Sequence, residues 1–140
     1  MRSEIVTLAR AWIGTPYRHQ MSRQGVGVDC LGLVLGVWDS LFGTQPEQIA
    51  PYHLNAPDLP GRLMAGLERH FTRRGICEAQ TGDVLVFDLR SSCQMRHLAI
   101  ATSDQSFVHA YSRHGVVESA FSAPWRRRLV TTFAFPQGEF

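Results

Sequence analysis

The hydrophobic pattern of the first third of the chain predicts two helices joined by a loop. Apolar residues recur at helical spacing over 3–13, and a Gly-Thr-Pro sequence ends that pattern. The run 30–42 is apolar on both faces, with Asp29 as its N-cap and Gly43 at its C′ position. We therefore expect an amphipathic first helix, an irregular loop, and a buried central helix that starts at Cys30.

The remainder of the chain predicts one more helix and then strands. The proline-containing segment 44–60 has no periodicity and is expected to lack regular structure, whereas 63–71 has the pattern of a surface helix. After Gly82 we expect strands only, at 84–89, 97–102, 107–112, 116–119 and 129–135. Helices followed by an antiparallel sheet of about five strands is an α+β arrangement, which we expect to form a single domain over 1–140.

Composition and charge narrow the class of protein. The chain has 140 residues, 44% hydrophobic and 19% charged, which is typical of one globular domain with one core. Its 14 basic residues, all arginine, face 12 acidic ones, a balance too even to predict nucleic-acid binding. Glu4 and Arg10 interrupt the apolar character of the start, and no long apolar run follows. We therefore expect synthesis in the cytoplasm, no signal peptide and no membrane span.

The cysteines and scattered histidines do not predict a disulfide framework or a metal site. Cys30, Cys77 and Cys93 are odd in number and form no C-x-x-C pair, and Cys93 lies in a polar loop as a bystander thiol. We expect no metal and no cofactor, because three further histidines lack the spacing of metal ligands: His19, His53 and His70.

Candidate chemistry centres on Cys30, at the first turn of the predicted central helix. A helix N-terminus favours a thiolate and offers free N–H groups to an oxyanion. A nucleophilic thiol needs a base, and two histidines on predicted strands are candidates, His97 and His109. A buried cysteine that acts as a small hydrophobe and a satisfied core histidine are the competing interpretations. The three residues together favour nucleophilic catalysis.

The turn between the two histidine strands decides whether the imidazoles can meet. A three-residue loop centred on Ser103 would place His97 directly opposite His109 on one face. A two-residue turn at Asp104-Gln105 would pair position 97 with 112 and put the histidines on opposite faces. The sequence leaves both registers open.

Five short motifs resemble, in order and spacing, the NlpC-type cysteine peptidases of bacterial cell walls, and the resemblance covers nearly the whole chain. The motifs are Gly14-Thr15-Pro16-Tyr17, Asp29-Cys30-x-Gly32-Leu33, Gly82-Asp83-Val84-Leu85-Val86-Phe87, His97-x-Ala99-Ile100 and His109-Ala110. The stretches 15–20 and 29–34 are similar to the branch encoded with phage tails and gene transfer agents.

The resemblance implies a papain-like α+β domain that cleaves peptidoglycan stem peptides, typically beside the γ-D-glutamyl-diaminopimelate linkage. Cys30 matches the nucleophile, His97 the base and His109 the orienting third residue. Tyr17 matches the family's active-site tyrosine, which would polarise the carbonyl or seat the substrate, and Asp29 matches an acidic residue that would contact the stem peptide. These assignments describe a cell-wall endopeptidase that uses a Cys-His-His site and no cofactor.

The same branch implies a setting for the activity. We expect a chain that is synthesised in the cytoplasm, joins tail-tip or hub proteins of a phage-like particle, and acts in the cell wall or periplasm of the target cell. The segment 44–60 and the Arg126–Arg128 edge are the surfaces nominated for docking. Leu31 stands where most members have serine, so a substrate contact from that hydroxyl is missing. The alternatives are a catalytically silent tail-tip adaptor and a papain-like amidase or acyltransferase with another substrate.

Overall fold

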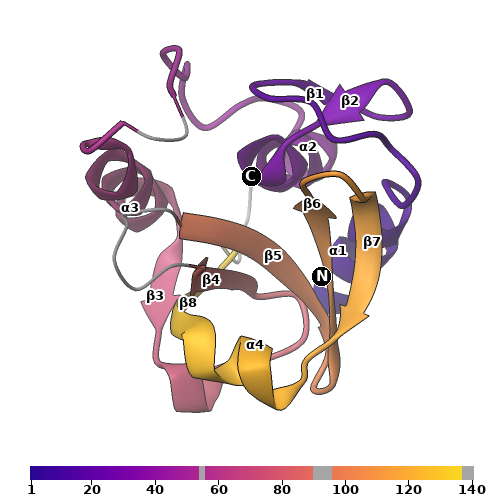
Figure 1. Ribbon diagram of the computed structural model, residues 1–140, viewed down its shortest axis with the longest axis vertical. Helices are drawn as coiled ribbons and strands as arrows, with labels where there is room; N and C mark the ends of the chain where they lie inside the picture. The colour runs from indigo at the N-terminus through magenta and orange to yellow at the C-terminus, as the bar shows by residue number, and fades with distance from the viewer. Residues whose placement is uncertain (54–55, 90–95, 137–140) are drawn as a thin grey trace.

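The computed structural model describes residues 1–53, 56–89 and 96–136, and Figure 1 traces its elements along the chain. The helices are α1 (Arg2–Arg10), α2 (Cys30–Phe42), α3 (Leu59–His70) and α4 (Ala123–Arg128), with a 3-10 turn η1 (Ile76–Glu78). The strands are β1 (Ser22–Arg23), β2 (Gly27–Val28), β3 (Thr72–Arg74), β4 (Val84–Asp88), β5 (Arg96–Ser103), β6 (Ser106–Tyr111), β7 (Gly115–Ala120) and β8 (Leu129–Ala134).

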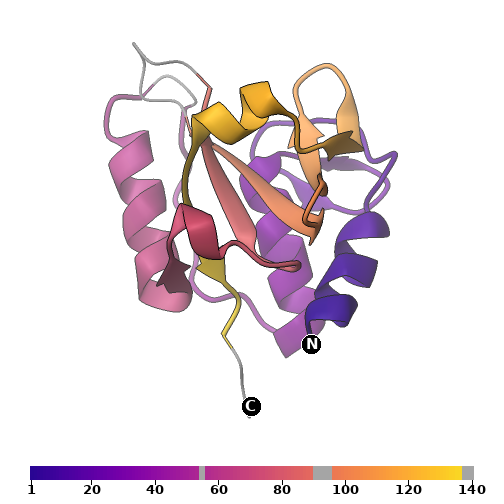
Figure 2. The same ribbon diagram turned by 90° about the horizontal axis from the view of Figure 1, so that it is seen from below.

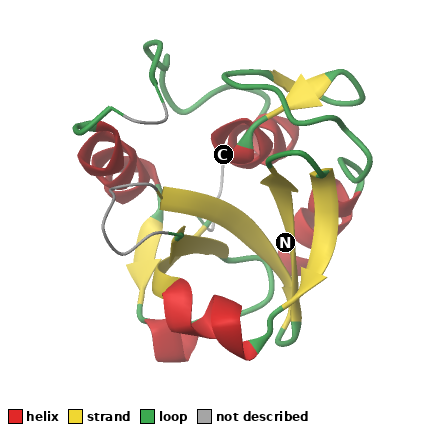
Figure 3. Cartoon of the chain, in the orientation of Figure 1, coloured by secondary structure: helices red, strands yellow, loops and turns green. Residues whose placement is uncertain are grey.

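A six-stranded antiparallel sheet in the order β3-β8-β4-β5-β6-β7 forms the centre of the molecule (Figure 3). Residues of α1, α2 and α3 pack with one face of the sheet in the larger core cluster. The opposite face packs in a second cluster under α4, which lies across the sheet in Figure 2. The α+β class and the five expected strands are confirmed, and β3 adds a sixth strand at one edge.

Helix α2 begins and ends where the local sequence signals predict. The Asp29 carboxylate accepts a hydrogen bond of 2.7 Å from the N–H of Gly32, and Gly43 closes the helix in the left-handed conformation at φ 75°. A Cβ on Gly36 would lie 2.2 Å from the ring of Trp12, so a glycine here lets α1 approach closely. Burial on both sides fixes α2 as the central helix, with Cys30 at its start.

The expectation of strands only after Gly82 is wrong, because α4 interrupts them. This helix has six residues and one large apolar side chain, Trp125, which is too little for a helical period to be recognised. Its three arginines are exposed, as expected for an edge, but two of them bind backbone carbonyls of this chain. Arg126 donates hydrogen bonds to the carbonyl oxygens of Phe121 and Asp104, at 3.0 and 2.8 Å, and Arg128 donates to that of Leu89 at 2.7 Å. They fasten α4 to the sheet.

Two other regions refine the expectations. The loop between α1 and α2 contains the small antiparallel pair β1–β2. Within the described part of 44–58 there is no helix or strand, as expected, but α3 starts at Leu59, earlier than predicted, because proline is tolerated in the first turn of a helix. No helix among the described residues is long and apolar enough to cross a membrane.

Candidate active site

Cys30 places its sulfur between the start of α2 and strand β5. The backbone N–H groups of Cys30, Leu31 and Leu98 are hydrogen-bond donors to the sulfur and lower the pKa of the thiol. Burial raises that pKa, the Asp29 carboxylate raises it further, and the balance is about 12. The N–H groups at the helix start favour the thiolate, as expected, but desolvation outweighs them. Near neutral pH the thiol of Cys30 therefore carries its proton.

The two histidines lie on neighbouring strands, β5 and β6, and their rings meet. Nε2 of His97 is 2.7 Å from Nδ1 of His109. His97 is 6% exposed and His109 is fully buried. Burial lowers the pKa of His97 to about 3, with a contribution from His109, and burial lowers the pKa of His109 to about 4. Both imidazoles are thus neutral near pH 7.

The geometry of the pair leaves one nitrogen available for the thiol. The contact with His109 uses Nε2 of His97, and among the described residues Nδ1 of His97 has no hydrogen bond, to the sulfur of Cys30 or to another group. Leu98, whose N–H faces the sulfur of Cys30, directly follows His97 on β5. The thiol thus lies against the backbone of the residue that follows His97, and no direct contact between the sulfur and the imidazole is present among the described residues.

The hairpin register differs from the one that would set His97 directly opposite His109. Ser103 pairs with Ser106 across a two-residue turn, which is the second of the two registers that the sequence leaves open. The next paired residues are Ala101 and Phe107, so the step from one pair to the next takes two residues on β5 and one residue on β6, and the register shifts. This bulge at Thr102 reverses the alternation of β5. It returns the two histidines to one face as diagonal neighbours, which explains their hydrogen bond.

Aromatic side chains enclose the imidazole pair. The ring of Trp125, from α4, lies 6.0 Å from that of His97 and 5.4 Å from that of His109, centroid to centroid. Three further aromatic residues contact one or both rings: Phe87, Phe107 and Tyr111. This apolar enclosure is the physical origin of the lowered pKa values. Sequence analysis missed Trp125 because it missed α4.

The carboxylate of Asp29, 2% exposed, is occupied by donors from the protein itself. Besides the N–H of Gly32, it accepts a hydrogen bond of 2.8 Å from the N–H of Gln20 and another from the hydroxyl of Tyr52. The group thus holds the start of α2, the loop before it and the proline-containing segment together. Both oxygens of the Asp29 carboxylate therefore accept hydrogen bonds from this chain.

Two tyrosines flank the site. Tyr17 is half-buried and bridged to Val28, and its pKa is raised first by burial and then by the neighbouring Cys30 and Asp29 side chains, so its phenol keeps its proton. Tyr52 was missed because it lies in the segment expected to be structureless. Burial and the hydrogen bond to Asp29 raise its pKa as well. A tyrosine in an otherwise polar segment was the one signal that could have indicated Tyr52, because a phenol that becomes buried needs a hydrogen-bond partner such as Asp29.

The other cysteines and metal-ligand candidates stand apart from this site. Cys77 is a free, exposed thiol in η1, and Cys93 lies outside the described residues. The described residues contain no cluster of three or more histidine, cysteine, aspartate or glutamate side chains that could hold a metal ion.

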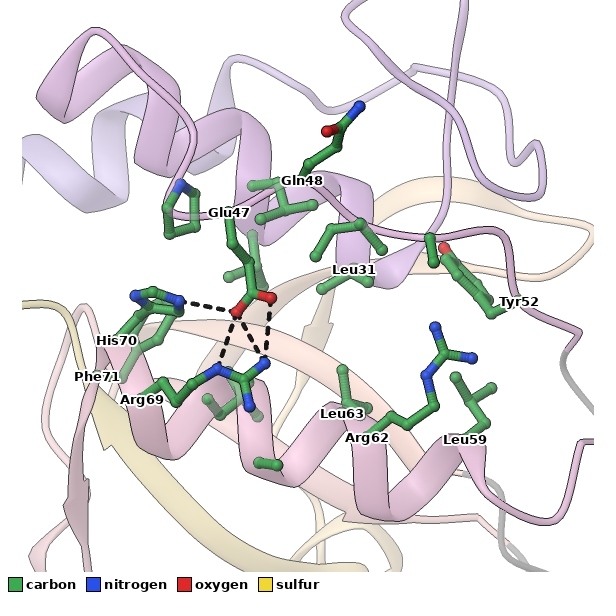
Figure 4. Close-up of a pocket in the computed structure, with 18 residues that line it drawn as sticks. Leu31, Glu47, Gln48, Tyr52, Leu59, Arg62, Leu63, Arg69, His70 and Phe71 are labelled. Carbon is green, nitrogen blue, oxygen red and sulfur yellow. Dashed lines mark hydrogen bonds and ion pairs between the residues drawn. The ribbon is translucent and has the colours of Figure 1, made fainter.

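A pocket of about 310 Å³ adjoins the site, between α2, the segment 46–50 and α3 (Figure 4). Leu31, the residue after the nucleophile candidate, and Tyr52 both line it. Another part of its wall is formed by Glu47, which accepts hydrogen bonds of 2.8 Å from both Arg69 and His70. The pocket is therefore mainly apolar, and Glu47, Arg69 and His70 form a charged cluster at its wall.

Comparisons with known proteins agree with this fold. A probable endopeptidase of Haemophilus influenzae is 30% identical over 117 residues, which are 81% of this chain and 62% of that protein, so the chain spans less than two thirds of its relative. The NlpC/p60 domain of the peptidoglycan hydrolase SagA has a TM-score of 0.69 at 21% identity, covering 96% of this chain and 99% of that one. An NlpC/P60 protein of Bacillus cereus has a TM-score of 0.70 at 15% identity, covering 96% and 40%. The sequence pattern of the NlpC/P60 family matches residues 14–133, and we conclude that the chain belongs to the NlpC/P60 family.

Proposed function

We propose that this protein is a peptidoglycan endopeptidase that cleaves stem peptides with Cys30 as its nucleophile. The observation that carries the proposal is the hydrogen bond between Nε2 of His97 and Nδ1 of His109, which leaves Nδ1 of His97 without a partner among the described residues. The next residue of the strand, Leu98, donates its N–H to the sulfur of Cys30. Family membership and the probable endopeptidase of Haemophilus influenzae support the reaction class.

In the first step, the sulfur of Cys30 attacks the carbonyl carbon of the scissile amide. With thiol and imidazole pKa values of about 12 and about 3, the resting pair is neutral, so the thiol proton moves to Nδ1 of His97 as the C–S bond forms. The carbonyl π electrons move to oxygen, and the N–H of Cys30 at the start of α2 stabilises the resulting oxyanion.

The remaining steps return the site to its resting state. The imidazolium of His97 donates its proton to the leaving amine, the C–N bond breaks, and a thioester forms on Cys30. A water molecule then gives a proton to His97 and attacks the thioester. Collapse of that intermediate releases the carboxylic acid, and His97 returns a proton to the sulfur. His109 orients the ring of His97 throughout, through the 2.7 Å hydrogen bond.

The other site residues act on the substrate and on the shape of the site. The protonated phenol of Tyr17, beside Cys30, donates a hydrogen bond to the bound peptide. Asp29, held by Tyr52, fixes the start of α2, and Leu31 presents an apolar surface to the neighbouring pocket. We assign the γ-D-glutamyl-diaminopimelate bond as the preferred cleavage site, on the resemblance of the motifs around Tyr17 and Cys30 to the peptidases that cut there.

The test is digestion of purified peptidoglycan, with the released peptides identified by mass spectrometry. The native protein should release fragments cut at the γ-D-glutamyl-diaminopimelate bond, Cys30→Ala and His97→Ala should release none, and Cys77→Ala should match the native protein. Equal products from native protein and Cys30→Ala would support a silent adaptor instead. Release of intact stem peptides freed from the glycan, or transfer of an acyl group, would support the amidase or acyltransferase alternative.

We further propose that the protein reaches its substrate as a component of a phage-like tail, bound to tail-tip or hub proteins. The sequences 15–20 and 29–34 support this, because they resemble the peptidases encoded with such tails. Of the two nominated docking surfaces we favour the segment 44–60, because Arg126 and Arg128 already bind backbone carbonyls of this chain. Purified particles should contain the chain when probed with a specific antibody. Its absence from particles would defeat the delivery proposal and leave the chemistry untouched.

A further inference from the structure

We propose that Ser119 is a positioning residue of the thiol site, which keeps His109, and through it His97, in the tautomers that proton transfer from Cys30 requires. The inference rests on the proposed function. The hydroxyl oxygen of Ser119 lies 2.9 Å from Nε2 of His109, whose Nδ1 lies 2.7 Å from Nε2 of His97. The three residues come from the neighbouring strands β7, β6 and β5 and form one hydrogen-bonded row across the sheet.

The row can carry its protons in two directions, and only one of them supports the reaction. If His97 holds its proton on Nε2, it donates to Nδ1 of His109, and His109 must then donate from its own Nε2 to Ser119. Nδ1 of His97 is then unprotonated and can accept the thiol proton. In the reverse direction Ser119 donates, His109 donates from Nδ1, and Nδ1 of His97 already carries a proton. His97 would then be unable to act as the base.

Ser119 makes the productive direction possible because it supplies the acceptor at the end of the row. Within the described residues, Ser119 is the hydrogen-bond partner of Nε2 of His109. The rest of the ring's surroundings are aromatic, with Phe107, Tyr111 and Trp125 in contact with it. A buried N–H without an acceptor is strongly disfavoured. Without the hydroxyl, the pair would favour the tautomer in which Nε2 of His109 carries no proton, which is the unproductive one.

The position of Ser119 also allows its hydroxyl to act as an acceptor. Strand β7 is the edge of the sheet, and Ser119 is half-buried there. Its oxygen can therefore accept from His109 while its own proton is donated to solvent. When His97 becomes an imidazolium during the reaction, both of its nitrogens carry protons, and the same row of acceptors stabilises the charge.

The first test reads the tautomers directly, by ¹⁵N NMR of the histidine side chains near neutral pH, where both rings are neutral. We expect His97 and His109 of the native protein to carry their protons on Nε2. In Ser119→Ala we expect His109 to shift towards the Nδ1–H form, and in Ser119→Thr, which keeps a hydroxyl, to retain the native form. A native His109 protonated on Nδ1, or a Ser119→Ala spectrum identical to the native one, would overturn the inference.

The second test measures kcat and KM separately on a soluble stem peptide. Ser119→Ala should lower kcat by about tenfold with KM unchanged, as expected for one lost hydrogen bond behind the base, and Ser119→Thr should restore most of the rate. The matched control is Ser112→Ala, an exposed serine in the β6–β7 turn. An unchanged kcat in Ser119→Ala would count against the inference. Full activity of Cys30→Ala would instead defeat the proposed function, and the NMR result would then decide the inference alone.

Discussion

Replacement of Gly32 by alanine should destabilise the protein, although the same change stabilises most helices. Alanine is favoured over glycine by about 1 kcal/mol in a helix interior. A Cβ on Gly32, however, would lie 2.2 Å from the carbonyl oxygen of Met21, a backbone atom that cannot rotate away. The loop over α2 would have to move. It is tied there by two hydrogen bonds, from Asp29 N–H to Met21 O at 3.2 Å and from Ser22 Oγ to Gly32 O at 2.7 Å.

The magnitudes decide the sign. Overpacking costs about 1–3 kcal/mol, and each of the two hydrogen bonds contributes about 1 kcal/mol. These losses exceed the gain in helix propensity of about 1 kcal/mol. We therefore expect Gly32→Ala to lower the free energy of unfolding by about 2–4 kcal/mol. Because the displaced loop also donates the Gln20 N–H to Asp29, next to Cys30, peptidase activity should fall as well.

The assay is urea denaturation followed by circular dichroism, with Gly66→Ala in α3 as the matched control. A Cβ on Gly66 would meet its nearest atom, the end of the Arg69 side chain, at 3.6 Å, an ordinary contact. This substitution should therefore raise stability, by up to about 1 kcal/mol. We therefore expect Gly32→Ala to lower the free energy of unfolding and Gly66→Ala to raise it. A neutral or stabilising Gly32→Ala would refute the argument that the loop packs tightly on the start of α2.

Three further predictions follow from the core and from the titrating groups. Trp38→Ala, which empties a site buried among aromatic rings, should cost about 3–5 kcal/mol in urea denaturation; a cost below about 1 kcal/mol would show that this core collapses without it. His97 and His109 have pKa values of about 3 and about 4 in the folded state, below the unfolded value near 6.5, so the unfolded chain binds more protons as the pH falls below 6.5. Stability should thus fall by up to about 1.4 kcal/mol per pH unit for each histidine below pH 6.5 and stay level above it, and equal urea midpoints at about pH 7 and about pH 5 would contradict this. Without substrate, mild alkylation followed by peptide mapping should label the exposed Cys77 before Cys30, whose pKa is about 12; faster labelling of Cys30 would reveal a thiolate in the resting protein.

Local signals in the sequence were sufficient for the central helix, the strands and the order of the site residues. Asp29 and Gly43 fix the ends of α2 because capping depends on the few residues beside each terminus. The strand runs were recognisable because alternation and turn residues are local properties too. The positions of Cys30, His97 and His109 followed from the motifs that they carry.

Tertiary structure decided how these residues meet and in which protonation state. The bulge at Thr102 sets both histidines on one face, and no residue pattern in the hairpin distinguished it from a plain two-residue turn. Tyr52 reaches Asp29 from a segment without regular structure, and Trp125 covers the imidazoles from a helix too short to show a period. The pKa of Cys30 also depends on tertiary structure. The helix N-terminus, which lowers this pKa, is a local feature of the sequence, whereas the burial that raises it depends on elements brought together from the whole chain.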